Sequence, residues 1–507
     1  MGDSEGAVSA VEDQFDRWRR RVGLVLAPVV FGVLWFVPVE GMSGEAHRLL
    51  SVFGLVIWLW LTEAIPLAVT ALMGPALCVV FGVCSEKEAF RGFGNPILFL
   101  FMGSFMLAQA MMHHGLNHRI AMVILRLPWV GRSPGRIVAA FALIVCGLSM
   151  WISNTSATAM MFPVAMAILS EMARRRSEQL GRPVAVADLR YGIGLMLATA
   201  FAASIGGMAT PVGSPPNLIG LGLIEQGVGA KIGFFQWMAF GVPLSLALAG
   251  FLIVYLNWTC PAEGGLLGGV LQGVVTEVKE PLSRGAKNVL LAFGATVVLW
   301  LMPGIITATV GASSPAAAWL SGHVPESVAA LVGAALLFVL PVDWRRGEFT
   351  LSWREARRIE WGTILFFGGG LSMGEMMFST GLAKWMGEGI ASALPAHTEL
   401  GLVAVFAVVG LALTEVTSNT AAAAMVVPIA IAVAQAAGVD PMPCALAATL
   451  SASLAFMLPI STPPNAIVYG SGCVPILKMV RHGVVLDAVA VVLVVAVVHW
   501  AVPLVLG

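Results

Sequence analysis

The sequence predicts an all-α, multi-pass membrane protein with about 11 transmembrane helices plus two re-entrant helical hairpins in an inverted-topology repeat. Composition gives the class: 58% of the 507 residues are hydrophobic and 11% are charged, whereas soluble proteins carry about 25% charged residues. Apolar runs long enough to span a bilayer recur from Val22 onward. The repeat is indicated by two copies of Ser-Asn-Thr, at 153–155 and 418–420, each inside an apolar stretch. The net charge of zero gives no indication of a nucleic-acid partner.

Residues 1–21 are expected to form a cytoplasmic N-terminal tail. The tail ends in a basic cluster made of Arg17, Arg19, Arg20 and Arg21. Basic residues beside a membrane span favour the cytoplasmic side. The apolar run that follows begins too late for a signal peptide and has no clear cleavage site. Residues 22–95 are then expected to form scaffold helices near 22–40, 48–64 and 66–83.

The first repeat is expected to cover residues 96–256. A helix near 96–113 leads to the Arg-rich segment 113–136, which is predicted to be an amphipathic helix at the membrane surface, with an ordinary cytoplasmic loop as the alternative. The apolar block 137–173 has basic residues at both ends and polar ones at its middle. It is either a pair of full-length helices or a re-entrant hairpin. We favour the hairpin, because its tip has no charged residue suited to the far surface.

The segment 190–226 is expected to be a broken helix. Its middle contains Thr210-Pro211-Val212-Gly213-Ser214-Pro215-Pro216-Asn217. Proline and glycine at this density cannot continue a helix, so two half-helices should flank unwound backbone. A helix near 234–256 completes the repeat.

Residues 257–360 are expected to connect the two repeats. The predicted order is a Gly-rich cytoplasmic loop to about 286, helices near 287–303 and 326–341, and a basic loop.

The second repeat is expected to cover residues 361–507. Ile364 to Leu382 resembles Leu98 to Leu116, with Phe101/Phe367 and Gly103/Gly369 in register. A second hairpin at about 400–437, a broken helix at about 443–471 and a last helix at 484–506 follow. Counting crossings places the ends of the first hairpin in the cytoplasm and those of the second outside, which is an inverted repeat with an external C-terminus.

The two hairpin tips are the predicted binding site. The match extends over eleven residues, SNTSATAMMFP against SNTAAAAMVVP, and each tip has a partner break, Ser-Pro-Pro-Asn or Thr-Pro-Pro-Asn. Helix N-termini suit an anion, and Ser, Thr, Asn and carbonyl oxygens suit a hard cation such as Na⁺. Ser and Thr often only join neighbouring membrane helices, but recurrence in matching contexts favours a function.

These motifs, together with Thr62-Glu63-Ala64-Ile65-Pro66-Leu67, resemble the divalent-anion:sodium symporter family over nearly the whole chain. The resemblance implies one Na⁺ site at Ser149, Ser153, Asn154 and Gly213. It implies a second at Thr414, Thr417, Asn419 and Ser461. The implied substrate contacts are Ser153, Asn154, Thr155, Ser214, Ser418, Asn419, Thr420, Thr462 and Pro463. It also implies a homodimer whose transport domains move in the manner of an elevator.

Charged residues play a limited part in the predicted site. No Lys or Arg lies at either tip or break, so anion binding should depend on helix dipoles, amides and bound Na⁺. Glu415 stands three residues before the second Ser-Asn-Thr, where the first repeat has Met150. We expect Glu415 to orient the hairpin through hydrogen bonds, with a proton-binding or cation-binding role as the alternative.

The leading hypothesis is a secondary transporter in a bacterial plasma membrane that couples Na⁺ entry to uptake of a C4-dicarboxylate such as succinate, malate or fumarate. A Na⁺-independent dicarboxylate exchanger, or a citrate, sulfate or arsenite-type transporter, would use the same fold. Na⁺ is the expected coupling ion, and no other cofactor is expected. A membrane enzyme is disfavoured because His113 and His114 lack carboxylate partners at ligand spacing. A channel is disfavoured because paired broken helices suit alternating access.

Overall fold

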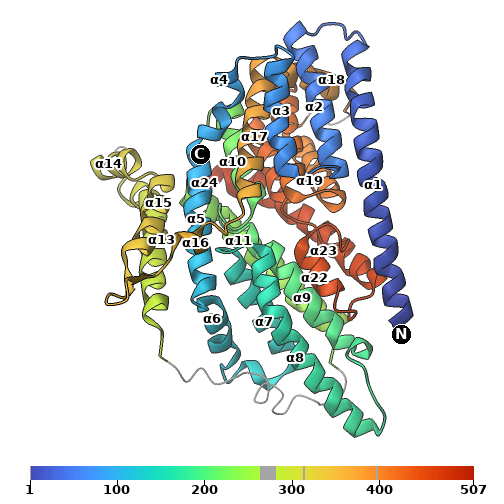
Figure 1. Ribbon diagram of the computed structural model, residues 1–507, viewed down its shortest axis with the longest axis vertical. Coiled ribbons are helices and arrows are strands. Elements are labelled where there is room, and N and C mark those ends of the chain that lie inside the picture. Colours follow the sequence, from blue (N-terminus) through green and yellow to red (C-terminus); the bar gives the residue numbers. More distant parts are fainter. Residues whose placement is uncertain (1, 263–280, 312–313, 395–397, 507) are drawn as a thin grey trace.

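The computed structural model describes residues 2–262, 281–311, 314–394 and 398–506, most of them helical (Figure 1). Within these residues eight helical segments are long and apolar enough to cross a membrane. They are α2 (Gly44–Thr62), α5 (Pro96–His113), α8 (Asn154–Leu180), α11 (Phe234–Thr259), α13 (Arg284–Val310), α19 (Glu399–Val416), α20 (Asn419–Ala436) and the C-terminal segment Ile476–Leu506. Four shorter apolar helices are α3 (Leu67–Val80), α6 (Leu116–Leu125), α7 (Pro134–Ser149) and α15 (Glu326–Val339).

The first helix, α1, is longer than expected and spans Gly2–Phe36. The expected tail and the first apolar run therefore form one continuous helix. The tail contains Ala, Glu, Gln and Arg but no proline, and such residues favour helix over coil. An ion pair of 3.1 Å between Arg19 and Glu63 joins α1 to the end of α2. Two short helices, α4 (Glu86–Ala89) and η1 (Arg91–Gly94), then lead to α5.

The two matching helices of the repeat, one in each half of the chain, each pack closely against another helix. Helix α5 packs against α15, and α17 (Trp361–Ser379) packs against α3. Gly103 of α5 lies against the backbone of Ala330, and Gly369 of α17 lies against the backbone of Ala71, so a Cβ at either glycine would overlap its neighbour. The matched residues Phe101 and Phe367 also touch, with ring centroids 5.4 Å apart.

The connecting region contains elements that the sequence pattern did not predict. Helix α14 (Pro315–His323) lies between α13 and α15, at the opposite edge of the molecule from α1 in Figure 1. Strands β1 (Pro341–Asp343) and β2 (Glu348–Phe349) form a small antiparallel pair, followed by α16 (Trp353–Ala356). Most of the expected Gly-rich loop, residues 263–280, lies outside the described residues.

Two further boundaries differ from expectation. The amphipathic helix expected over 113–136 is divided into α6 and the short turn η2 (Val130–Arg132), because Pro128 and Gly131 interrupt the helical pattern. The last helix begins at Ile476, directly after Pro475, and not near 484. It continues from α23 (Ile476–Ala496) through the π-helical turn η4 (Val497–Ala501) into α24 (Val502–Leu506).

Each half contains a helical hairpin followed by a broken segment. The first hairpin is α7 with α8, and the first broken segment is α9 (Arg190–Gly207), residues 208–214 and α10 (Pro215–Val228), with the turn η3 (Val186–Asp188) before it. The second hairpin is α19 with α20, and the second broken segment is α21 (Pro441–Ser451), residues 452–462 and α22 (Pro463–Tyr469). Helix α18 (Leu382–Ala393) packs against α20.

The two halves interlock through these parts. Helix α10 of the first broken segment packs against α20 and α21, and α22 of the second broken segment packs against α8 and α9. Each broken segment therefore lies against the hairpin of the other half. This crossed packing brings the two predicted parts of the site into one region of the molecule.

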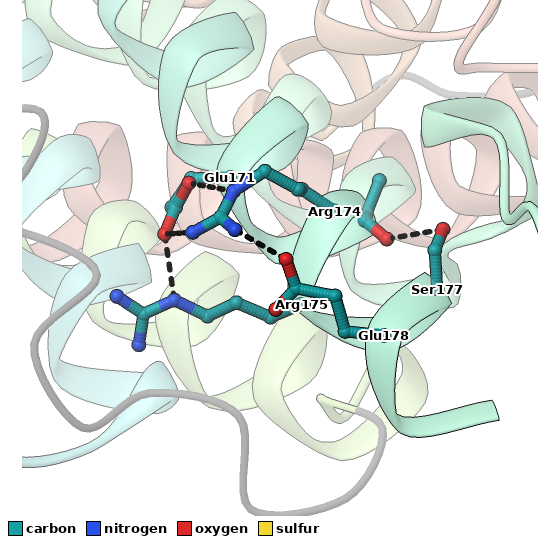
Figure 2. Close-up of polar contacts among 6 residues, drawn as sticks. Glu171, Arg174, Arg175, Ser177 and Glu178 are labelled. Carbon is teal, nitrogen blue, oxygen red and sulfur yellow. Dashed lines mark hydrogen bonds and ion pairs between the residues drawn. The ribbon is translucent and has the colours of Figure 1, made fainter. Parts of the chain in front are cut away.

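The far end of α8 is highly charged and contrasts with its apolar middle. Figure 2 shows Glu171 paired with Arg174 and Arg175, and Arg174 also paired with Glu178. Ion pairs three and four residues apart stabilise a helix exposed to water. This end of α8, α6 and the N-terminus all lie in the lower half of Figure 1, whereas the C-terminus lies in the upper half.

Candidate functional site

The tip of the first hairpin is formed by Ser149, at the end of α7, and Ser153, which caps α8. The Ser153 Oγ accepts a hydrogen bond from the Ser156 amide at 3.3 Å, as expected of an N-cap serine. The Ser149 hydroxyl donates to Asn154 Oδ1 at 2.6 Å. Two side-chain oxygens from opposite sides of the tip are thus in contact.

The first broken segment lies directly against this tip. Gly207 faces Asn154: a Cβ at Gly207 would lie 2.5 Å from Asn154 Oδ1, so a larger residue there would displace the Asn154 side chain. Gly213 lies against the carbonyls of Gly207 and Met150. The Thr210 hydroxyl donates to the Met150 carbonyl at 2.6 Å, which ties the unwound backbone to the tip. Several backbone and side-chain oxygens therefore gather around Asn154.

The second hairpin repeats this geometry. Ser418 caps α20 by accepting from the Ala421 amide at 3.2 Å. The Thr414 hydroxyl lies 2.6 Å from Asn419 Oδ1, the same distance as in the first tip, and it also lies 3.0 Å from the Ala452 carbonyl. The Thr417 hydroxyl is buried and has no hydrogen-bond partner among the described residues. The Thr417 oxygen of the second tip is therefore available to a ligand, because no described residue forms a hydrogen bond with it.

The asparagines of the two Pro-Pro-Asn sequences stabilise the unwound backbone of both breaks through hydrogen bonds. Asn217 Nδ2 donates to the carbonyls of Gly207 and Thr210, at 2.8 Å each. Asn465 Nδ2 donates to the carbonyls of Ala455 and Leu458, at 3.2 and 3.1 Å. The acceptors stand at the same two sequence offsets in both halves. The two breaks are therefore equivalent structures and not merely similar sequences.

Ser149 and Thr414 differ from several other buried hydroxyl residues in the helices. Thr199 and Thr449 donate to the carbonyl one turn earlier in their own helix, to Leu195 at 2.8 Å and to Ala445 at 2.7 Å. That arrangement is the usual structural use of Ser and Thr in an apolar helix. Ser149 and Thr414 instead donate across a hairpin tip to an asparagine oxygen.

The other predicted residues divide into buried and accessible groups. Six tip residues are half-buried: Ser153, Asn154, Thr155, Ser418, Asn419 and Thr420. Four break residues are buried: Gly213, Ser214, Ser461 and Thr462. Pro463 is exposed, Ser461 Oγ donates to the Leu458 carbonyl at 2.7 Å, and Thr462 caps α22. No hydrogen bond within the described parts of the chain joins 153–155 directly to 418–420.

A direct link between the halves runs instead through the breaks. Ser453 of the second broken segment donates to Asn217 Oδ1 of the first at 2.9 Å, and both side chains are fully buried. The sequence pattern placed Thr210, Asn217 and Asn465 in the breaks without giving them a role, and it did not point to Ser453. The sequence signal that could have revealed the role of Asn217 and Asn465 is that both stand at the same position relative to their breaks.

Glu415 accepts hydrogen bonds, but its partners belong to the broken segment and not to the hairpin that we expected it to orient. Its carboxylate accepts hydrogen bonds from the amides of Phe456, Met457 and Leu458, at 2.6, 3.0 and 3.2 Å. These amides lie in the unwound backbone between α21 and α22, where no helical acceptor serves them. Glu415 therefore joins the second tip to the second break, as Thr210 does in the first half.

The sequence matches a known family and several named relatives. Residues 18–506 match the model described as the sodium:sulfate symporter transmembrane region. The sodium-dependent dicarboxylate transporter SdcS of Staphylococcus saprophyticus is 33% identical over 495 residues, which cover 96% of this chain and 92% of the relative. The protein of the same name from Staphylococcus aureus is 32% identical over 496 residues, with the same coverage of both chains.

The fold also resembles a solved transporter. The crystal structure of the Alcanivorax borkumensis YdaH transporter, described as having an unusual topology, aligns with a TM-score of 0.54 over 96% of this chain and 99% of that one. At 14% identity this likeness concerns the fold alone. The family match and the relatives at 32–33% identity both extend over nearly the whole chain. This protein therefore belongs to the sodium:sulfate, or divalent-anion:sodium, symporter family, and it is a multi-pass membrane transporter and not an enzyme.

Proposed function

We propose that this protein couples Na⁺ entry to the uptake of a C4-dicarboxylate such as succinate, malate or fumarate. The observation that carries the proposal is the duplicated tip, in which a hydroxyl donates to an asparagine oxygen at 2.6 Å in both halves. The relatives' name, sodium-dependent dicarboxylate transporter, supports the same ion and substrate class. Two equivalent oxygen clusters beside two helix N-termini suit two cations flanking one dianion.

The first cation would bind at Ser149, Ser153, Asn154 and the backbone near Gly213. The second would bind at Thr414, Thr417, Asn419 and the backbone at Ser461. The contact of Ser149 with Asn154 and the unpaired hydroxyl of Thr417 support these assignments. Neutral oxygens suit Na⁺ because they supply ligands without the cost of a permanent buried charge.

The dianion would bind between the tips, against the N-termini of α8 and α20. The first amides of a helix have no acceptor within that helix and carry partial positive charge. Asn154 and Asn419 add amide donors, and the neighbouring contacts would be Ser153, Thr155, Ser214, Ser418, Thr420, Thr462 and Pro463. Because no Lys or Arg lies at the tips or breaks, substrate binding should require bound Na⁺ for charge balance.

Movement would carry the two hairpins and two broken segments together as a transport domain of a homodimer. The crossed packing of α10 on α20 and of α22 on α8 supports one moving unit. The basic N-terminal cluster and the charged end of α8 support a cytoplasmic N-terminus and an external C-terminus in a bacterial plasma membrane.

Uptake of radiolabelled succinate into proteoliposomes tests this function. We expect an inward Na⁺ gradient to drive accumulation, and an equal K⁺ gradient to give only the rate of protein-free vesicles. Vesicles preloaded with succinate and lacking Na⁺ test for exchange. Uptake that proceeds equally well without Na⁺ would replace symport with exchange. If unlabelled citrate or sulfate competes with the labelled uptake and unlabelled succinate does not, the substrate belongs to another class.

Replacing Ser149 with alanine should raise the Na⁺ concentration for half-maximal uptake by roughly 10-fold, because one ligand of the first cation is lost. Ser104→Ala is the matched control, since that buried hydroxyl donates at 2.6 Å only to Leu100 one turn earlier in α5. We expect the control to keep the wild-type Na⁺ dependence. An identical Na⁺ dependence in Ser149→Ala and Ser104→Ala would remove Ser149 from the cation site.

A further inference from the structure

A cavity of about 560 Å³ lies outside the residues that are predicted to bind cations and substrate. Its walls come from the loop before α11, from α11 and α13, from the start of α15 and from α24. None of the lining residues belongs to a hairpin tip or to a break. Cavities that bind organic ligands usually have volumes of roughly 300–1,000 Å³, so this one is large enough for a ligand.

The cavity lies where three membrane-crossing segments reach the same surface. Helix α11 begins at Phe234, α13 ends at Val310 and the C-terminal segment ends at Leu506, and the residues of these segments that line the cavity lie near those ends. An apolar helix leaves the hydrocarbon layer close to its end. Leu504, at the edge of the cavity, is 86% exposed and is open to lipid. The cavity is therefore at the depth where acyl chains meet head groups.

Most of the cavity wall is apolar. The rings of Phe234 and Trp300 stack with centroids 4.6 Å apart. Gly304 lies so close to Phe235 that a Cβ at this glycine would overlap the ring. The other apolar lining residues are Ala239, Pro303, Ala308, Val324, Pro325, Leu504 and Val505. A hydrocarbon chain suits such a wall, because burying apolar surface there is favourable.

Two opposite charges stand in the same cavity without forming an ion pair. They are Lys231, which is exposed, and Glu326, which is half-buried. Within the described residues, neither takes part in a salt bridge. Glu326 Oε1 accepts the Phe234 amide at 2.6 Å, and Oε2 accepts no hydrogen bond from a described residue. The cavity thus presents a cation and an anion separately, beside an apolar wall.

This arrangement of charges selects among membrane lipids. A lipid whose head group carries only a negative charge would suit Lys231 but would be repelled by Glu326. A head group that carries both charges complements both residues, and an ammonium with N–H groups also donates a charge-assisted hydrogen bond to the carboxylate. A quaternary ammonium has the charge but no N–H group to donate.

We propose that this cavity binds one phospholipid whose head group carries a primary ammonium, such as phosphatidylethanolamine. The phosphate pairs with Lys231, the ammonium donates to Glu326, and an acyl chain lies along the apolar wall.

The bound lipid would support the first hairpin tip. Phe234 stacks on Trp300 in the cavity wall and also on Trp151, at 6.4 Å. Trp151 stands between Ser149 and Ser153 of the first tip and packs edge-on against Phe293 of α13 at 5.3 Å. An aromatic row therefore connects the lipid cavity to the tip, and lipid packed against one end of the row stabilises the contact of the tip with α13.

Native mass spectrometry of the purified full-length protein in detergent tests the site. The protein is incubated with phosphatidylethanolamine, phosphatidylcholine or phosphatidylglycerol that carry the same two acyl chains, and bound lipid is counted per protomer. We expect the wild type to bind one phosphatidylethanolamine about 10-fold more tightly than either other lipid, because only this head group pairs with both charges.

Two variants separate the two charges. Glu326→Gln keeps an oxygen for the Phe234 amide and should lower the affinity for phosphatidylethanolamine to that for phosphatidylcholine. Lys231→Gln should weaken the binding of all three lipids by about 5-fold, because all three contain the phosphate. Lys384→Gln is the control, since Lys384 is exposed on α18 beside Glu388, and it should bind lipid as the wild type does.

Equal affinities of the wild type for the three lipids would overturn the proposal. So would a wild-type protomer that retains none of them, as expected if a second copy of the chain covers the cavity, or identical binding by Lys231→Gln and Lys384→Gln. The wild type and Lys231→Gln decide the question even where Glu326→Gln folds poorly, because Lys231 is exposed. The lipid counts need no transport substrate, so they stand whatever the succinate assay shows.

Discussion

Replacing Asn154 or Asn419 with alanine should reduce Na⁺-driven succinate uptake by at least about 100-fold, while the protein still folds and inserts. Each side chain is expected to have two roles, one in cation binding and one in substrate binding. Its Oδ1, which now lies 2.6 Å from a hydroxyl, would face the cation, and its amide would donate to a substrate carboxylate. Alanine removes both, and the loss of either cation would also remove charge that the dianion requires.

Substitution of Asn154 by aspartate separates the role in cation binding from the role in substrate binding. Asn154→Asp keeps the shape and the Oδ1 atom, so Na⁺ should still raise the unfolding temperature of the purified protein. It replaces the amide donor by a negative charge, so succinate uptake should be lost through repulsion of the dianion.

Asn257→Ala serves as the control for both tip asparagines. That half-buried amide donates to the Gly135 carbonyl at 3.3 Å and to the Ile253 carbonyl at 2.9 Å, away from both tips. We expect near wild-type uptake from Asn257→Ala. Coupled uptake that survives Asn154→Ala and Asn419→Ala would disprove the site assignment.

Replacing Glu415 with alanine should lower the stability of the protein by roughly 3–5 kcal/mol, because one buried and two part-buried amides lose their acceptor. The affected amides are those of residues 456–458 in the unwound part of the second break. Glu415→Gln should cost less, about 1–2 kcal/mol, since its remaining carbonyl oxygen can still accept. Unfolding temperatures in detergent should therefore rank wild type first, then Glu415→Gln, then Glu415→Ala.

Glu375→Gln is the matched control for this series. Glu375 pairs with Arg91 at 2.7 Å at the surface, and exposed ion pairs contribute little. Its unfolding temperature should equal that of the wild type. Equal unfolding temperatures for Glu415→Ala and the wild type would show that the three amide hydrogen bonds are unimportant for the fold.

The sequence by itself determined the class of protein, the repeat and the location of the tips. These properties depend on patterns that a chain displays locally: long apolar runs, clusters of Pro and Gly that a helix cannot accommodate, and serines placed to cap a helix. Ser153 and Ser418 cap α8 and α20 in the structure. The pattern was weaker at helix ends, as the continuous α1 and the early start of α23 at Ile476 show.

Only the tertiary structure decided which groups meet across the halves. The Ser453–Asn217 hydrogen bond, the crossed packing of α10 and α22, and the hydrogen bonds from the amides of residues 456–458 to Glu415 all join residues far apart in the chain. Periodicity and composition carry no information about such neighbours, because each depends on how several helices pack at once. By sequence, Glu415 is one acidic residue in an apolar segment, and its role depends on the unwound backbone that packing places beside it.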